Sequence, residues 1–165
     1  MSIAGNPRRT AVLVIVALAT LAACNDDNVF PTTPTTQSPD AVTAMKRAIQ
    51  AEYRVENTFL RVLADFGRVA PFQDILYTGQ RHSASIANLF VKRNVEVPAS
   101  DWDINNVPTY ASVQAACAAG AQAEEDIVAL YDELLVLSLP ADVEVTFANN
   151  RAASEDRLPA LEECG

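Results

Sequence analysis

Four stretches of this sequence repeat apolar residues at alternating intervals of three and four, and each repeat is interrupted near its middle by polar residues or glycine. This spacing keeps one side of an α-helix turned inward, so it predicts four amphipathic helices, and four such helices favour a bundle. The inward positions are Val42, Met45, Ile49, Glu52, Glu56, Phe59, Leu63 and Phe66; then Phe72, Ile75, Gly79, His82, Ile86 and Leu89; then Tyr110, Val113, Cys117, Gly120, Glu124, Ile127, Tyr131 and Leu134; and last Val143, Phe147, Asn150, Ser154, Arg157, Leu161 and Cys164.

The interruptions place ionisable side chains at the middle of the predicted core. They are Glu52, His82, Glu124 and Arg157, one from each stretch. Buried charge is costly unless it is paired with an opposite charge or holds a metal ion. The same four positions are therefore candidates either for an internal ion-pair cluster or for a metal site.

The composition is sufficient for a folded domain with a core, and its charge argues against a nucleic-acid partner. Half of the residues are hydrophobic, which is enough for a core, and the formal net charge is -9. Without residues 1–23 the charge is -11, because 10 basic residues then face 21 acidic ones. A strongly acidic surface repels phosphate backbones, so we expect no nucleic acid to bind.

Residues 1–23 have the features of a secretory signal peptide. Arg8 and Arg9 precede an apolar run that ends at Ala23 and is short for a membrane span. The small residues before Cys24 resemble the lipobox of bacterial lipoproteins, in which this cysteine is lipidated and becomes the first mature residue. We therefore expect a lipid anchor in a bacterial envelope membrane, with the chain on the periplasmic or extracellular face. The alternative is an ordinary signal peptide with a chance cysteine.

Residues 24–40 are predicted to be a flexible tether. They are polar and contain three prolines, so they have little apolar surface to bury. The helical domain is expected over residues 41–165. The link over residues 95–108 can reach about 45 Å when extended, which is enough for a crossover along a bundle.

Within the domain, helix boundaries follow from caps and prolines. The predicted helices begin near Asp40, after Pro71, near Thr109 and near Asp142, and Pro159 should bend or open the last one. Short links within the first and second pairs predict two antiparallel hairpins.

Two cysteines are expected at one end of this bundle. Cys117 lies near the start of the third helix and Cys164 at the end of the fourth, and both occupy inward positions. Outside the cytoplasm such a pair favours a disulfide. Two buried free thiols are the alternative, and a metal role is less favoured because the only histidine is distant in sequence.

Several short segments occur in an order that matches a known family. They are Glu52-Tyr53, Phe66-Gly67, Pro71-Phe72, Gln80-Arg81-His82, Ala116-Cys117, Gly120, Ala123-Glu124, Leu130-Tyr131-Asp132, Leu158-Pro159-Ala160 and Glu163-Cys164. With them, residues 41–165 resemble the bacterial ferritin-like domains grouped as DUF2202, which are relatives of rubrerythrin and ferritin. The resemblance implies a ferritin-like four-helix bundle.

The resemblance also implies positions for a di-metal centre, and here the sequence departs from the family. Ferritin-like centres use a glutamate from each of two helices and a Glu-x-x-His pair from each of the other two. Gly79 cannot ligate through a side chain, and Arg157 is a permanent cation where a histidine is expected. The matching positions are Glu52, Gly79 with His82, Glu124, and Ser154 with Arg157. The resemblance therefore implies a dismantled di-metal site.

Three interpretations of this layer remain open at the level of sequence. In the first, Arg157 neutralises Glu52 or Glu124 and the cluster is structural. In the second, one iron or manganese ion is held weakly by the three glutamates and the histidine, although Arg157 would repel it. In the third, a di-iron centre still works. The ligands of the second are Glu52, Glu56, His82 and Glu124.

The first interpretation predicts a non-catalytic binding or interaction module of the envelope. Its expected partners are the membrane, through the lipid anchor, and an unidentified envelope protein; its oligomeric state is left open. The competing prediction is a metal-dependent oxidoreductase or peroxide-handling protein that uses iron or manganese. A Ser-His-Asp arrangement and a phosphate-binding glycine loop are not evident in the sequence.

Overall fold

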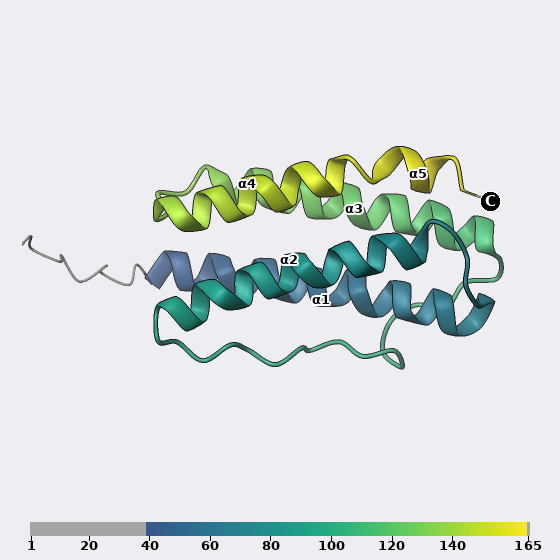
Figure 1. Ribbon diagram of the computed structural model, residues 1–165, viewed down its shortest axis with the longest axis horizontal. Helices are drawn as coiled ribbons and strands as arrows, with labels where there is room; N and C mark the ends of the chain where they lie inside the picture. The colour runs from purple at the N-terminus through teal and green to yellow at the C-terminus, as the bar shows by residue number, and fades with distance from the viewer. Residues whose placement is uncertain (1–38, 165) are drawn as a thin grey trace, which may run out of the picture. The chain divides into compact units, whose positions relative to one another are not determined.

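The computed structural model describes residues 39–164, which form an all-α four-helix bundle (Figure 1). The helices are α1 (Pro39–Phe66), α2 (Phe72–Lys92), α3 (Val113–Leu135), α4 (Ala141–Glu155) and the short α5 (Leu158–Glu162), which extends the line of α4. The fold class predicted from the apolar spacing is therefore confirmed. The expected signal segment, the predicted lipidation site Cys24 and residues 25–38 lie outside the described residues.

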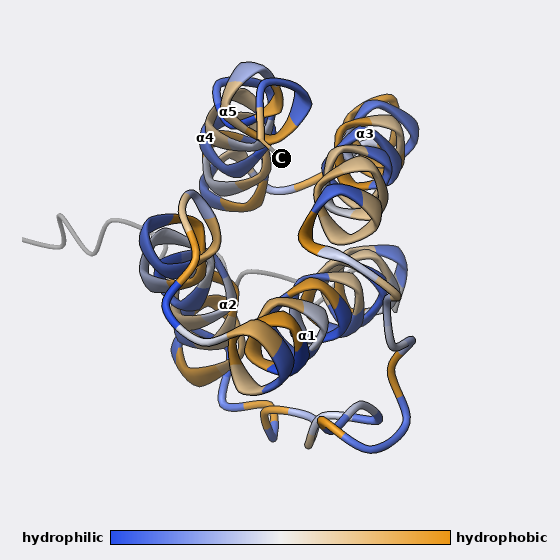
Figure 2. Cartoon of the chain, turned by 90° about the vertical axis from the view of Figure 1, so that its right-hand side faces the viewer, coloured by the Kyte–Doolittle hydropathy of each residue, from blue (hydrophilic) through white to orange (hydrophobic). Residues whose placement is uncertain are grey.

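The bundle consists of two antiparallel hairpins. The first joins α1 to α2 through a short turn that begins at Gly67, whose φ of 80° is a left-handed conformation that glycine adopts without strain. The Gly67 amide donates to the Leu63 carbonyl at 3.0 Å and so closes the end of α1. The second hairpin joins α3 to α4. In Figure 2 the four helical columns surround a common centre, with α1 beside α3 and α2 beside α4.

The connection over residues 93–112 is the predicted crossover, and it runs along the outer side of α1 (Figures 1 and 2). The Gln50 side chain holds it from α1, because its Nε2 donates to the Ala99 carbonyl at 2.6 Å and its Oε1 accepts from the Asp101 amide at 2.9 Å. The Arg54 guanidinium lies 5.1 Å from the centre of the Trp102 ring. The contact between Trp102 and Arg54 therefore helps to fix the crossover against α1.

The core lies between the four helices and includes most of the predicted inward positions, together with Phe90, which lies outside the predicted stripes. Its largest fully buried side chains include Tyr131, Phe59, Phe72, Phe90, Phe147, Met45, Ile49 and Leu134. Each buried side chain of this size contributes about 1.5–3 kcal/mol, so the core supplies the main driving force for folding. None of the helices in the described part of the chain is both long and apolar enough to cross a membrane.

The start of the third helix differs from the predicted one, and the fourth helix is divided in two. The third helix begins at Val113 rather than near Thr109, because the Ser112 hydroxyl accepts from the Ala115 amide at 3.1 Å and caps the helix there. The fourth predicted helix is divided into α4 and α5. Pro159 has no amide hydrogen for the Glu155 carbonyl, so the helix opens before it, as expected.

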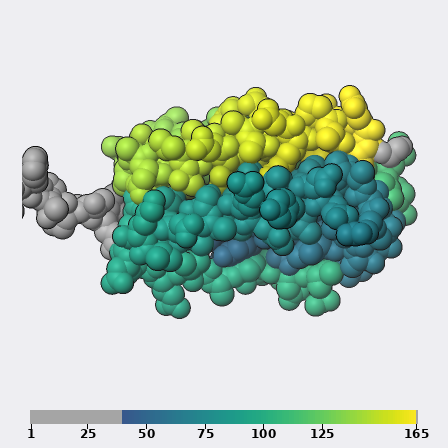
Figure 3. Space-filling model, in the orientation of Figure 1, coloured from purple at the N-terminus to yellow at the C-terminus, as the bar shows by residue number. Residues whose placement is uncertain are grey.

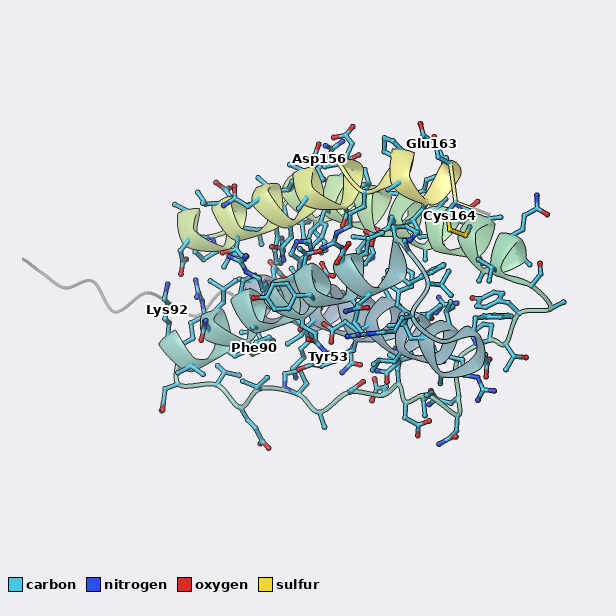
Figure 4. The ribbon with its side chains drawn as sticks, turned by 45° about the vertical axis from the view of Figure 1, so that its right-hand side comes forward. Tyr53, Phe90, Lys92, Asp156, Glu163 and Cys164 are labelled. Carbon is cyan, nitrogen blue, oxygen red and sulfur yellow. A yellow bond between two sulfur atoms is a disulfide. The ribbon has the colours of Figure 1, made fainter. Side chains whose placement is uncertain are left out.

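A disulfide joins Cys117 in α3 to Cys164 just after α5, with the two Cα atoms 5.6 Å apart. The predicted pairing is confirmed. Figure 4 draws the bond near the C-terminal end of the described chain. The bond closes a loop of 47 residues and fixes α5 against the beginning of α3.

Candidate functional site

The polar layer predicted from the interrupted stripes exists, and it lies at the centre of the bundle. Its side chains are almost fully removed from solvent: Glu52 from α1, His82 from α2, Glu124 from α3, Asn150 and Ser154 from α4, and Arg157 from the break between α4 and α5. The opening of the helix before Pro159 leaves Arg157 at that break. The layer therefore depends on contributions from all four columns.

Arg157 is the central cation of this layer. Its Nη1 donates to Oε1 of Glu124 at 3.0 Å, and its Nη2 lies 3.1 Å from Nε2 of His82. A guanidinium can only donate, so the facing ring nitrogen of His82 is the acceptor. Of the two carboxylates proposed as its partner, Arg157 therefore pairs with Glu124.

Glu52 belongs to a second set of hydrogen bonds that the sequence did not reveal. The Tyr131 hydroxyl donates to Oε1 of Glu52 at 2.6 Å, and Nδ1 of His82 lies 3.5 Å from the same oxygen. The Asn150 Nδ2 donates in turn to the Tyr131 hydroxyl at 3.1 Å. Burial, with help from Glu52, raises the pKa of Tyr131 well above its usual value, so the phenol remains a donor.

Tyr131 and Asn150 both lie on the predicted inward stripes, which was the available signal for their role. The apolar spacing places Tyr131 on an inward position without assigning it a partner. A buried phenol needs a hydrogen-bond partner, and Asn150 interrupts an apolar stripe, so both could have been placed in the polar layer. Their pairing with Glu52 needed the helix register, which the sequence does not contain.

Three buried oxygens in this region have no hydrogen-bond partner of good geometry. They are Oε1 of Glu56, Oε2 of Glu124 and the Ser154 hydroxyl. Burial raises the pKa of Glu124, although Arg157 opposes this and the nearby Ser154 hydroxyl also favours the ionised form. Burial likewise raises the pKa of Glu56, and Ser83 opposes it. The layer therefore holds more carboxylate oxygen than its one guanidinium can satisfy.

The donor set does not fit a di-metal centre. Glu124 is paired with Arg157, and Glu52 accepts from Tyr131. Position 79 has no side chain, and a Cβ there would touch only the Glu56 Cγ, at 3.7 Å. Across residues 39–164 there is no group of three or more His, Cys, Asp or Glu side chains placed to hold a metal ion.

The hypothesis of a single weak metal site made of Glu52, Glu56, His82 and Glu124 stays a prediction for metal analysis. Solvent or a small ligand can reach part of the polar layer through a surface pocket. A pocket of about 390 Å³ opens between α2 and α4, on the face shown in Figure 3, and reaches the edges of His82 and Asn150. Its other lining residues are Thr78, Arg81, Ser85, Thr146, Asn149 and Ala153.

Comparison with known proteins gives a fold but no family. No model of a known protein family matches this sequence, and neither does any curated protein. The bundle is similar to the crystal structure of a conserved hypothetical protein, Rv2844, from Mycobacterium tuberculosis, with a TM-score of 0.66 and 14% sequence identity. The match covers 77% of this chain and 98% of the other. At this identity the likeness shows the all-α bundle fold alone.

Proposed function

We propose that this protein is a non-catalytic binding or interaction module of the bacterial envelope, built on a ferritin-like bundle whose metal centre is replaced by an internal ion pair. The observation that carries the proposal is the buried contact between Arg157 and Glu124, at 3.0 Å, with His82 on the other side of the guanidinium. A permanent cation in this position repels metal ions and uses the carboxylate that would bind them.

The rest of the layer supports a structural role. The chain of donors from Asn150 through Tyr131 to Glu52 satisfies a carboxylate that would otherwise be available as a ligand. This chain links α1, α3 and α4, and alternative packings of these helices would break its hydrogen bonds. We therefore assign the layer a structural role, in which it fixes the register of the four helices. This role requires no catalytic activity.

The ferritin-like part of the proposal rests on the residue resemblance and on topology. Two antiparallel hairpins joined by a crossover that runs along the bundle are an arrangement used by ferritin-like folds. Ferritin-like folds build their metal centre from side chains in the bundle core, and the polar layer also lies in the core.

Envelope anchoring is the second part of the proposal. It is supported by the sequence features of residues 1–23 and by the disulfide, which fits an oxidising compartment. Cys24→Ser should release the protein from the membrane fraction and abolish a mass increase for attached lipid. Unchanged fractionation together with an unmodified Cys24 in the wild type would refute the anchor.

One observation favours a second candidate, an oxidoreductase or peroxide-handling protein that uses iron or manganese. Oε1 of Glu56 and Oε2 of Glu124 are buried without a partner, and a pocket reaches the neighbouring His82. Metal analysis of protein purified without chelators separates the two candidates. The proposal predicts less than about a tenth of an ion per chain, whereas about two per chain, as in di-metal bundles, would favour the oxidoreductase.

A further inference from the structure

A second pocket, distinct from the polar layer, lies between α1, α3 and the crossover. Its volume is about 560 Å³, which is within the range of small-molecule sites. Its lining combines side chains from three separate segments: Gln50, Ala51, Arg54, Val55 and Thr58 from α1; Trp102, Pro108 and Tyr110 from the crossover; and Ala119, Gln122, Ala123, Asp126, Ile127 and Leu130 from α3.

The sequence opens this pocket by using small residues where two helices face each other. Ala51 on α1 and Ala119 and Ala123 on α3 leave space that larger side chains would fill. Ile127 and Leu130 make its inner wall apolar. The crossover contributes the outer wall, and the two hydrogen bonds of Gln50 hold that wall in place.

Arg54 gives the pocket a positive charge with unused donors. Its guanidinium lies over the Trp102 ring, 5.1 Å from the ring centre. Burial raises the pKa of Tyr110, and the charge of Arg54 partly offsets this rise. Among residues 39–164, its side chain donates no hydrogen bond and pairs with no carboxylate, whereas Arg47 and Arg61 each have one. Stacking holds the guanidinium in place while leaving its fork of donors available.

We propose that this pocket binds a small amphipathic anion, with an apolar or aromatic body and a single acidic group such as a carboxylate or sulfonate. The apolar body would lie against the alanines, Ile127 and Leu130, and the acidic group would accept from Arg54. Asp126, on the α3 wall, accepts a hydrogen bond from Gln122 and places a carboxylate in the pocket. This carboxylate discriminates against ligands that carry a second acidic group.

This inference names the ligand class of the proposed binding module and rests on that role. The two can nevertheless fail separately. Metal uptake would contradict the replaced metal centre, and it can be excluded from the binding measurement by adding a chelator. Failure to bind an amphipathic anion would contradict the pocket without affecting the ion pair at Arg157.

Two fluorescent dyes test the proposal, since they differ mainly in one acidic group: anilinonaphthalene sulfonate and the uncharged phenylnaphthylamine. The whole chain carrying Cys24→Ser is titrated, so that neither lipid nor detergent competes. We expect one dye site per chain. Arg54→Gln should weaken binding of the sulfonate dye by about tenfold or more and leave the uncharged dye within about twofold, since a charge-assisted hydrogen bond is lost.

Two further variants complete the test. Arg61→Gln is the matched control, because Arg61 is on the same helix, pairs with Asp65 and does not line the pocket. It should bind both dyes like the wild type. Ala123→Phe should fill the pocket and weaken both dyes. Unchanged melting and near-ultraviolet circular dichroism establish folding. The proposal is overturned if neither dye binds the wild type, if Arg54→Gln and Arg61→Gln behave alike, or if folded Ala123→Phe binds normally.

Discussion

The Arg157 guanidinium donates to the Glu124 carboxylate at 3.0 Å, and both side chains are buried at the centre of a four-helix bundle. This contact connects the middle of α3 with the break between α4 and α5. It also places a fixed positive charge among Glu52, Glu56 and Glu124. The energetic consequence is that neither partner can be removed without leaving an uncompensated charge or an unpaired donor in the core.

The first prediction concerns this pair. Arg157→Ala should lower the free energy of unfolding by about 3–5 kcal/mol, because Glu124 then stays buried without its counter-ion. Urea denaturation at neutral pH measures the loss. The matched control is Arg151→Ala, since Arg151 pairs with Asp132 on the exposed surface of the same region, and we expect little change there. Equal losses in the two variants would show that the buried pair has no special role.

Two buried glycines should respond in opposite ways to alanine. A Cβ at Gly79 would meet only the Glu56 Cγ at 3.7 Å, so Gly79→Ala should stabilise the helix by up to about 1 kcal/mol. A Cβ at Gly120 would lie 3.0 Å from Leu161 and 3.3 Å from the Phe59 and Phe72 rings. Gly120→Ala should therefore cost about 1–3 kcal/mol through overpacking. The melting temperatures of the two variants measure these effects. A higher melting temperature for Gly120→Ala would mean that the packing around Gly120 is looser than the contacts described above.

The buried carboxylates predict a definite pH dependence. Burial raises the folded-state pKa of Glu56 and of Glu124, so between the unfolded and folded pKa values the folded chain binds more protons than the unfolded chain. These two groups should therefore make stability fall as pH rises from about 4.3 through their folded values. Glu56→Gln should flatten this fall, because it keeps the side chain neutral.

The control for the pH prediction is Asp132→Asn. Arg151 lowers the pKa of Asp132, so its stabilising effect is lost only at more acidic pH, and this variant should leave the slope above about pH 4.3 unchanged. Denaturation midpoints at several pH values provide the comparison. A slope in Glu56→Gln identical to that of the wild type would contradict the assignment to Glu56.

The disulfide should be a major source of stability. It closes a loop of 47 residues, so replacing Cys117 and Cys164 by alanine should lower the free energy of unfolding by about 4 kcal/mol in the chain-entropy account. Peptide mapping without reduction should find the two cysteines cross-linked in protein from its native compartment. Free thiols at both positions would contradict the bond.

Much of the fold followed from apolar spacing, because helix periodicity directly encodes which face is buried. The hairpins, the crossover and the opening before Pro159 could all be anticipated from spacing, link length and the chemistry of proline. The start of α3 could not. Thr109 and Ser112 are both plausible caps, and Tyr110 fits the apolar spacing, so only the hydrogen bond from the Ala115 amide to Ser112 decides between them.

The sequence pattern predicted which residues form the site, but it did not predict which of them hydrogen-bond to one another. Glu52, His82, Glu124 and Arg157 were expected at one level, and they are buried there. The choice of Glu124 over Glu52 as the partner of Arg157 depends on the rotation of each helix. The role of Tyr131 depends on the distance between α1 and α3. Neither quantity is contained in a single sequence.

The central claim is that an internal ion pair occupies the place of a metal centre, and thermal denaturation with added manganese or ferrous iron tests it most directly. The melting temperature of the wild type should not change at micromolar metal, because Arg157 already neutralises Glu124. The double variant Gly79→Glu with Arg157→His restores two of the three missing ligands, with Ser154 still in the place of the third, and it should gain stability with metal by mass action on the folded state. A rise of several degrees in the wild type, with no greater rise in the double variant, would contradict the claim.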